Sequence, residues 1–331
     1  MRILVKSIFL IFVLSNHSRV LSADLDHVTF SQRLMGTDVK IVMNYSKSSD
    51  LEAAVKKAYL EGNRLNFIFS DYIADSELSK FSRSSNSVSS ENFKLSKELF
   101  VVLNYCLTLS TLSNGSFDPT LGPLTRLWRI SRHQRIFPEK SKLTNALSRS
   151  GAKYLKLDEI QQTGHLLAPN MVLDLGGVAK GYIADRMLEV LKDYGFPRSL
   201  VDAGGDLRIG DAPLGSAGWK IDISGRKYEK LTMLKLANCA VATSGDTEQF
   251  LKINDTQYSH ILDPKTGIGL ANQAQATVIA PTGMEADSLA STFLVTGFEE
   301  ASALIKKTNA KHLYFVEKRG DQIIFNEIHR D

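Results

Sequence analysis

A glycine-bearing turn, Gly176-Gly177, constrains the fold more than any other feature of the sequence. The apolar segment Val172-Leu173-Asp174 before it has the pattern of a strand end, and a helical pattern follows it. That helix is expected to stop at Gly195, and its apolar face carries Ala184, Met187, Leu188 and Leu191. The second half of the chain is therefore predicted to contain a strand, a tight turn and a buried helix in direct succession.

Short strands and helices are expected to alternate irregularly around this turn. Strands are predicted at 38–43, 200–202, 219–223, 231–236, 276–280, 313–316 and 323–325. Helices are predicted from Asp50 to Phe69, from Ser96 through Leu107 with Gly115 as the stop, and at 141–150, 284–295 and 299–308. The serine-rich stretch 82–90 and the basic stretch 128–142 are expected at the surface. Because no repeat at a fixed period is visible, we predict an α+β fold with helices flanking mixed or antiparallel sheets.

The first 23 residues have the composition of an export signal. Arg2 and Lys6 form a positive head, an apolar run follows at 8–14, and small residues precede Asp24. We therefore expect a signal peptide at 1–23, a single domain at 24–331, and a periplasmic or otherwise exported protein. The alternative is an uncleaved membrane anchor.

Charge and cysteine content exclude several classes of function. The chain has 40 Lys and Arg against 36 Asp and Glu, and three of the basic residues lie in the first 23, where no acidic residue occurs. The remainder is almost neutral, which argues against nucleic-acid binding. Only two cysteines are present, so a disulfide-dense scaffold or a multi-cysteine metal cluster is excluded. Cys106 and Cys239 both lie in apolar runs and are expected to be buried, and the sequence leaves open whether they pair.

Six aspartates each follow an apolar run or border a glycine turn, with Asp246 as a further case. They are Asp118, Asp174, Asp202, Asp206, Asp263 and Asp287. Carboxylates at strand ends beside glycines are often ligand or metal contacts. The alternative for any single one is a helix cap or an Asx turn.

The segment from Asp174 to Gly181 has the features of a phosphate site. A glycine turn that enters a helix presents backbone N–H groups and the positive end of the helix dipole, and Lys180 adds a positive charge. The spacing fits neither a Walker loop nor, at 203–206, a dinucleotide fingerprint. A purely structural strand-to-helix turn is the alternative.

Two later segments carry candidate catalytic groups. His260 lies between hydroxyl residues and a Pro-x-Thr-Gly turn, which would suit a general base, and Asp263 is the alternative base if burial raised its pKa. Asp287 and Ser291 are four residues apart at a helix start and so share one face. A carboxylate with a hydroxyl suits Mg²⁺, although an acidic first turn also stabilises its own helix.

Taken in chain order, these segments resemble the ApbE family of FAD:protein FMN transferases. The resemblance rests on 35–37, 75–79, 115–124, 174–181, 204–206, 242–246, 259–267 and 286–291, which span nearly all of the chain after the leader. It implies an enzyme that uses FAD as a substrate with Mg²⁺, transfers FMN to a threonine or serine of an acceptor protein, and releases AMP. The acceptor would be a subunit of an electron-transfer or ion-pumping complex, with peripheral association at the inner membrane.

The resemblance also implies roles for individual residues. The FAD site would be lined by Met35, Tyr72, Ser116, Phe117, Asp118, Asp174, Lys180 and Ile261, with Leu262 as the alternative to Ile261. The metal would be held by Asp287, by the Ser291 hydroxyl and by the Gly177 carbonyl. Ser291 stands where the family usually has Thr, and the adjacent Thr292 is an alternative ligand. His260 would activate the acceptor hydroxyl, and together with Asp287 it forms the expected catalytic pair.

Two other functions are compatible with the same residues. An FAD pyrophosphatase would use water in place of the acceptor hydroxyl and would release FMN and AMP. A non-catalytic periplasmic flavin-binding protein would need neither His260 nor Asp287, and the presence of both favours an enzyme.

Overall fold

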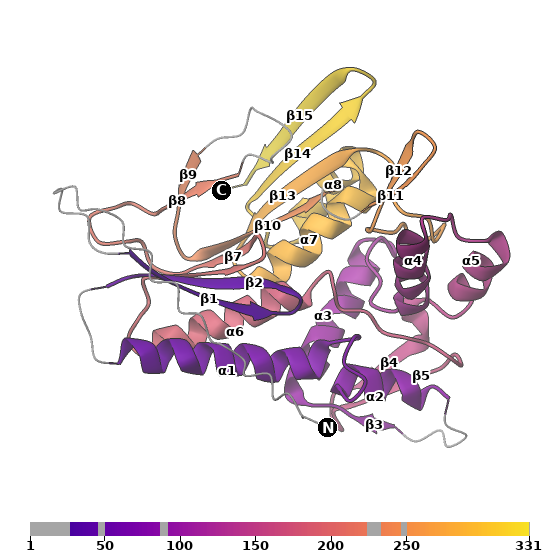
Figure 1. Ribbon diagram of the computed structural model, residues 1–331, viewed down its shortest axis with the longest axis horizontal. Helices are drawn as coiled ribbons and strands as arrows, with labels where there is room; N and C mark the ends of the chain where they lie inside the picture. Colours follow the sequence, from indigo (N-terminus) through magenta and orange to yellow (C-terminus); the bar gives the residue numbers. More distant parts are fainter. Residues whose placement is uncertain (1–26, 46–49, 87–91, 224–232, 246–249, 331) are drawn as a thin grey trace, which may run out of the picture.

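The computed structural model describes residues 27–45, 50–86, 92–223, 233–245 and 250–330, and its central feature is an antiparallel sheet (Figure 1). Within these residues eight strands form the sheet, in the order β1-β2-β6-β7-β10-β13-β14-β15. Their bounds are β1 (His27–Leu34), β2 (Thr37–Asn44), β6 (Ser199–Ala203), β7 (Asp206–Ile209), β10 (Cys239–Gly245), β13 (Ala274–Ala280), β14 (His312–Arg319) and β15 (Gln322–His329). The expected α+β class is confirmed, and each strand pairing in the described residues is antiparallel.

The sheet has an apolar layer on each face, because alternate residues of a strand point to opposite sides. Val201 of β6 packs into the main core with the helices, whereas its neighbour Leu200 packs on the other side with Trp219 and Ile221. Those two residues belong to β8 (Trp219–Asp222), which pairs with β9 (Met233–Leu236) as a separate ribbon.

Three helices cover the main face of the sheet. They are α1 (Leu51–Phe69), α6 (Ala179–Asp193) and α7 (Gly283–Thr296). Helix α6 packs on β6 and β7, α7 packs on β10 and β13, and α1 lies against α6 (Figure 1). Helices α6 and α7 also pack against each other, and their first turns meet at Gly181 and Gly283.

Four further helices form a layer beside the ends of α6 and α7 (Figure 1). They are α2 (Glu77–Ser84), α3 (Lys97–Leu112), α4 (Gly122–Gln134) and α5 (Lys140–Leu147), whereas α8 (Phe298–Leu304) packs against α7. Small sheets are formed by β3 (Phe93–Lys94) with β5 (Thr163–Leu166) and β4 (Leu155–Asp158), and by β11 (Phe250–Ile253) with β12 (Thr256–Ser259). Among the described residues, no helix has the length and apolar character that a bilayer crossing requires.

Two segments expected at the surface are partly helical and contain buried residues, although 133–136 and 139–142 are exposed as expected. Ser82 to Ser84 end α2, and the buried Ser82 hydroxyl accepts a hydrogen bond from the Leu173 N–H at 3.0 Å. Residues 128–134 belong to α4, where Trp128 is buried and donates from Nε1 to the Gly267 carbonyl at 2.8 Å. In both cases the polar composition did not indicate which side chains would be buried, because their hydrogen-bond partners lie far away in the sequence.

The strand expected at 172–174 is also absent from the described structure. Val172 makes only an isolated bridge to Leu121, and the Asp174 N–H donates to the Pro119 carbonyl at 2.8 Å. This segment is extended, but its neighbour is a loop rather than a strand. The last expected helix, 299–308, ends at Leu304 and continues as a single 3-10 turn.

Expectations on the helix caps and the cysteines hold in part within the described residues. Ser96 caps α3 by accepting from the Leu99 N–H at 3.2 Å, whereas Asp50 precedes α1 without a side-chain capping bond. Cys106 is buried as expected, Cys239 is half-buried, and both are free thiols. Strands β1, β7 and β10 of the central sheet were not expected, and neither were the strands β3, β4, β5, β11 and β12 of the small sheets or the helices α2 and α4. Asp246, residues 231–232 and the leader at 1–23 lie outside the described residues.

Candidate functional site

The candidate site begins where α6 and α7 cross. A β-carbon on Gly181 would overlap the carbonyl oxygen of Gly283, so the two helices approach this closely only because both positions are glycine. Each helix then supplies a carboxylate to the first turn of the other. Asp287 accepts from the Gly181 N–H at 3.1 Å, and Asp185 accepts from the N–H of Gly283 at 2.7 Å and of Met284 at 3.0 Å. The carboxylates are stabilised by the positive ends of both helices.

Asp287 lies in a buried cluster of charges with Lys180 and Asp206. The Lys180 ammonium forms an ion pair with Asp206 and lies 4.0 Å from Asp287 Oδ1. The pKa of Asp287 is raised to about 7, chiefly by burial and also by the nearby Asp206, while Lys180 and the Gly181 N–H oppose the shift. Two buried carboxylates that share one ammonium make a site that favours an additional cation.

Ser291 and Gly177 meet on the same side of α7 as Asp287. A β-carbon on Gly177 would lie 3.6 Å from Ser291 Oγ and 3.6 Å from the Phe117 ring. Ser291 Oγ is hydrogen-bonded to Ser244 Oγ at 3.0 Å. The Thr292 hydroxyl is buried and donates to the Ser288 carbonyl at 2.7 Å, so it is committed to its own helix. Of the two hydroxyls, only Ser291 lies beside Gly177.

These donors could hold a hard divalent cation. The described residues contain no group of three or more His, Cys, Asp or Glu side chains that could bind a metal. The set expected here is different, because it combines the carboxylate of Asp287 with the hydroxyl of Ser291 and the backbone of Gly177. Oxygen-only donors with one charge suit Mg²⁺, which keeps water or phosphate oxygens in its remaining positions.

A second cluster surrounds Arg129 of α4. Its guanidinium forms an ion pair with Asp71 and a hydrogen bond to Asp174 Oδ2 at 3.1 Å. The same guanidinium lies 4.2 Å from the centre of the Tyr72 ring. Asp174 Oδ1 accepts from the Gly176 N–H at 2.8 Å, which connects this cluster to the glycine turn.

Comparison with known proteins identifies the fold and the family. The model of the ApbE family matches residues 35–315. The chain belongs to the ApbE family. Among curated relatives, the FAD:protein FMN transferase of Treponema pallidum is 28% identical over 282 residues, which cover 80% of this chain and 77% of that protein. The protein of the same name from Vibrio cholerae is 28% identical over 309 residues and 89% of both chains.

Solved structures agree with this assignment. The flavin transferase ApbE from Vibrio cholerae superposes with a TM-score of 0.82 and 26% identity, covering 91% of this chain and 97% of that one. The ApbE protein of Thermotoga maritima superposes with a TM-score of 0.79 at 25% identity, and the match covers 90% of this chain and 96% of that one. The sequence-based identification of an ApbE transferase is therefore confirmed.

Met35 is one of the residues predicted to line the FAD site of this ApbE-family chain. It lies at the turn between β1 and β2 and has a positive φ of 54°. The tip of this hairpin abuts the β6–β7 turn, because a β-carbon on Gly204 would overlap the Thr37 side chain. Since Asp206 begins β7, the hairpin tip and the Lys180 cluster belong to the same end of the sheet.

Ser116, Phe117 and Asp118 form a largely buried turn next to the glycine segment. The Phe117 ring lies beside Gly177, since a β-carbon added there would be 3.6 Å from it. Asp118 Oδ1 accepts from the Thr120 N–H at 2.8 Å, and Oδ2 accepts from the Ala152 N–H at 2.9 Å. Burial raises the pKa of Asp118, while these hydrogen bonds oppose the shift. Its carboxylate therefore holds the turn together.

His260 and Ile261 follow β12 directly. Ile261 is half-buried against the main core, whereas Leu262 is buried in the cluster around Trp128, so Ile261 is the more accessible of the two. Asp263 accepts from the Lys265 N–H at 2.9 Å and from the Thr266 hydroxyl at 3.0 Å. Since both of its oxygens hold this turn, Asp263 is poorly placed to act as a base.

Three of the six aspartates singled out in the sequence therefore have structural roles. Asp118 and Asp263 hold turns as described, and Asp202 accepts from the Gly205 N–H at 2.7 Å. Asp206 and Asp287 converge on Lys180, while Asp174 connects the glycine turn to Arg129.

The sequence interpretation missed Arg129, Asp185 and the hydroxyl of Ser244 as individual site residues. Helical spacing of Leu124 and Trp128 after Pro123, which is well suited to a first helical turn, could have revealed α4 and with it Arg129. Nothing local marks Asp185 or Ser244, because their partners are about a hundred and about fifty residues away.

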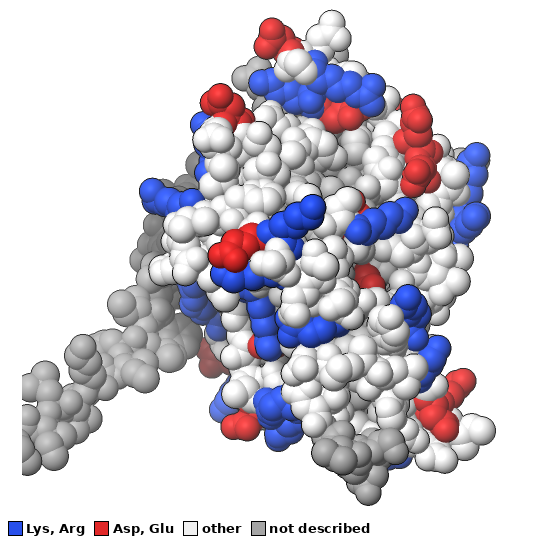
Figure 2. Space-filling model, turned by 90° about the vertical axis from the view of Figure 1, so that its right-hand side faces the viewer, with Lys and Arg blue, Asp and Glu red and all other residues white. Residues whose placement is uncertain are grey.

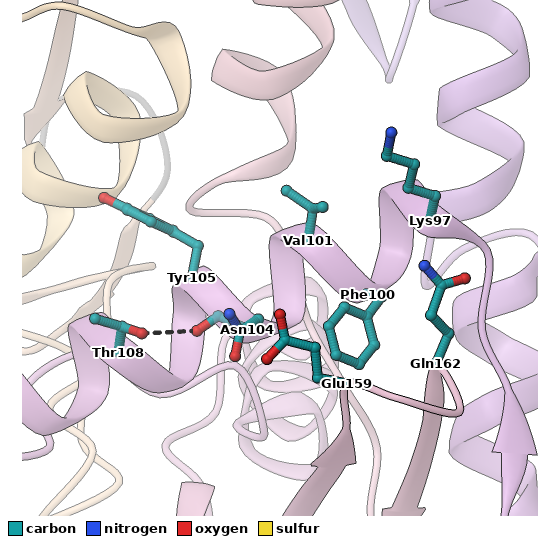
Figure 3. A pocket seen from close by; sticks show the side chains of 8 residues that line it. All are labelled: Lys97, Phe100, Val101, Asn104, Tyr105, Thr108, Glu159 and Gln162. Carbon is teal, nitrogen blue, oxygen red and sulfur yellow. Dashed lines mark hydrogen bonds between the residues drawn. The ribbon is translucent and has the colours of Figure 1, made fainter.

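One hollow of the described structure lies away from these residues. A groove of about 450 Å³ follows the outer side of α3 and the β4–β5 turn, and none of the predicted site residues lines it (Figure 3). Tyr105, on its wall, reaches Ser288 of α7 with a hydrogen bond of 2.8 Å. On the face that carries α4 and α5, basic side chains are spread among uncharged surface rather than gathered in one patch (Figure 2).

Proposed function

We propose that this transferase moves FMN from FAD to a threonine or serine hydroxyl of an acceptor protein and releases AMP. The observation that carries the proposal is the convergence of Asp287, Ser291 and Gly177 beside Lys180 and the N-terminus of α6. The acceptor oxygen would form a bond to the flavin-side phosphorus as the bond from that phosphorus to the AMP oxygen breaks. The names of the relatives support the same reaction.

Asp287, Ser291 and the Gly177 carbonyl would hold Mg²⁺. Bound there, the cation would supply neutralisation of the pyrophosphate charge and of the charge that develops on the leaving AMP oxygen. Lys180 would contact the phosphates, and the first N–H groups of α6 would add to the positive field. The raised pKa of Asp287 supports this role, because a cation would relieve its unfavourable burial next to Asp206.

The flavin portion would lie between the glycine turn and the Tyr72 loop. Tyr72 is 76% exposed, so most of its ring is accessible for stacking on the isoalloxazine. The Ser116-Phe117-Asp118 turn, Asp174, Met35 and Ile261 would form the walls of the pocket. The acceptor hydroxyl would lose its proton to His260 as it attacks.

We also propose that the chain is exported, with residues 1–23 as a signal peptide and 24–331 as the functional domain. The acceptor would then be an extracytoplasmic subunit of an electron-transfer or ion-pumping complex, at or near the inner membrane. N-terminal sequencing of the protein from its native cells should find a start close to Asp24. An intact Met1 on a cytoplasmic protein would contradict export, and an intact Met1 in the membrane fraction would indicate an anchor.

The reaction itself is tested by incubating the protein with FAD and Mg²⁺, with and without an acceptor subunit of the host's electron-transfer complex that was produced free of flavin, so that its acceptor hydroxyl is unmodified. The proposal expects AMP and covalently bound flavin only when the acceptor is present. Equal AMP release without acceptor would indicate a pyrophosphatase. Binding of FAD without AMP under either condition would indicate a flavin-binding protein.

A further inference from the structure

One guanidinium connects three groups from two loops of the candidate flavin site. Arg129 pairs with Asp71, bonds Asp174 at 3.1 Å and covers the Tyr72 ring at 4.2 Å. The Asp71 and Asp174 side chains are only 8% and 10% exposed, so these contacts are largely shielded from water. Such partly buried, charge-assisted contacts are stronger than exposed ion pairs.

The arrangement depends on a positive charge at position 129. Burial and the nearby Asp174 both raise the pKa of Asp71, and Arg129 opposes them. Without the guanidinium, two largely buried carboxylates would face each other without a shared partner. The loop after α1 and the glycine turn before α6 would then separate or change conformation.

The backbone at Arg129 is held in place by its neighbour Trp128. The preceding residue, Trp128, is 2% exposed and holds the turn after His260 through the hydrogen bond from its Nε1 to the Gly267 carbonyl. Helix α4 therefore presents Arg129 from a rigid position, and the guanidinium covers one face of Tyr72 while most of that side chain remains accessible.

We propose that Arg129 is a positioning residue of the flavin site: it fixes the Tyr72 ring and the Asp174 carboxylate in the arrangement that receives FAD. This inference rests on the proposed function, because the ligand it positions for is the flavin. Arg129 acts through its two neighbours and needs no contact of its own with FAD.

The test compares Arg129→Gln and Arg129→Lys with the wild type in Mg²⁺. FAD affinity is measured by titration calorimetry, and flavin transfer is measured at saturating FAD. Loss of a charged hydrogen-bonding partner is expected to raise the FAD dissociation constant about tenfold in Arg129→Gln. Transfer at saturating FAD should stay within about twofold of the wild type, because chemistry is assigned to other residues. Arg129→Lys should also bind weakly, since an ammonium lacks the planar set of donors with which the guanidinium contacts both carboxylates and the Tyr72 ring.

Arg135→Gln is the matched control, because it removes the same charge from an exposed residue at the C-terminal end of α4. Arg126 is unsuitable for this purpose, because its charge also lowers the pKa of Asp71. Arg135→Gln should bind FAD as the wild type does. Wild-type affinity in Arg129→Gln would overturn the inference, and so would an equal loss of affinity in the Arg135 control.

Asp71→Asn supplies a second, independent test. If the Arg129→Gln defect comes from two facing carboxylates, removing one of them should restore part of the FAD affinity in the double variant. Additive losses would overturn the inference. Thermal unfolding of each variant shows whether it is folded, and the double variant remains informative if Arg129→Gln is unstable.

Failure of the inference can be distinguished from failure of the proposed function. If the wild type binds FAD but transfers no flavin, the proposed reaction fails and the affinity measurements still decide the role of Arg129. If the wild type transfers flavin and Arg129→Gln binds FAD equally well, only the inference on Arg129 fails.

Discussion

The Gly181 N–H donates to the Asp287 carboxylate at 3.1 Å and so joins the first turn of α6 to the first half of α7. Asp185 makes the reverse connection, from α6 to the start of α7. This reciprocal pair sets the helix crossing on which the candidate metal site is built. The geometry of Ser291 and Gly177 depends on it, because both residues lie within two turns of the crossing.

Gly181→Ala is therefore expected to damage both stability and activity. The added methyl group would overlap the backbone of Gly283, so the helices must separate, at a cost of about 1–3 kcal/mol in unfolding free energy. Gly245→Ala is the control for stability, because a β-carbon there meets nothing closer than 3.5 Å. Urea unfolding of both variants checks this, and equal midpoints would contradict the close crossing.

Asp287→Ala is expected to abolish Mg²⁺-dependent AMP release, because the remaining hydroxyl and carbonyl donors carry no charge. The metal-free protein should still fold, since burial raises the pKa of this carboxyl and so makes its charge unfavourable there. Mg²⁺ should raise the melting temperature of the wild type but not of the variant. Asp158→Ala, which changes a carboxylate in a distant turn, should keep the Mg²⁺ response. Full AMP release by Asp287→Ala would remove this residue from the site.

His260→Ala should slow flavin transfer by about a hundredfold while changing FAD affinity little, as expected for loss of a positioned base. Asp263→Asn is the matched comparison, because Asp263 is the alternative base and its oxygens already hold a turn. It should keep most of the transfer rate. Transfer at the wild-type rate in His260→Ala would refute the assignment, and a parallel loss of binding and transfer would assign His260 to the shape of the pocket.

His312 is expected to make the β14–β15 hairpin sensitive to acid. Burial lowers its pKa below the ordinary value of 6.5, and His329 and Lys311 lower it further. The unfolded chain therefore takes up a proton at this residue before the folded chain does, so stability is lost as the pH falls through that range. Between about pH 8 and about pH 5.5 the urea midpoint should fall more for the wild type than for His312→Gln. His133→Gln, at an exposed position of α4, should behave as the wild type, and identical falls in all three would contradict the prediction.

The parts of the fold that follow from local patterns could be predicted from the sequence. Helices α6 and α7 have helical spacing and glycine turns, and the four-residue separation of Asp287 and Ser291 places them on one face. What these residues meet across the fold could not be predicted in the same way. The choice between Ser291 and Thr292 depends on which hydroxyl is bonded to the helix backbone, and that becomes visible only in three dimensions.

The errors of the sequence-based predictions have the same cause, because contacts between distant parts of the chain are not visible in local patterns. The basic composition of 128–142 favours an exposed segment, yet Trp128 is buried because Gly267, far along the chain, accepts its N–H. An aspartate beside a glycine looks the same in sequence whether it holds a turn, as Asp202 does, or faces a lysine, as Asp206 does. The two roles differ in the group that contacts the carboxylate, and for Asp206 that group, Lys180, belongs to another element.

The contact between Gly181 and Asp287 joins positions 106 residues apart in the chain. Closing so long a loop costs conformational entropy that local helix formation does not repay, so such contacts form late in folding. A growing chain that ends before α7 contains Gly177, Lys180 and Asp206 but lacks both side-chain donors proposed for the metal. The ability to bind a cation should therefore appear in one cooperative step, as the C-terminal third of the protein folds onto α6. Translation products that end before α7 should bind no cation at this site and should transfer no flavin.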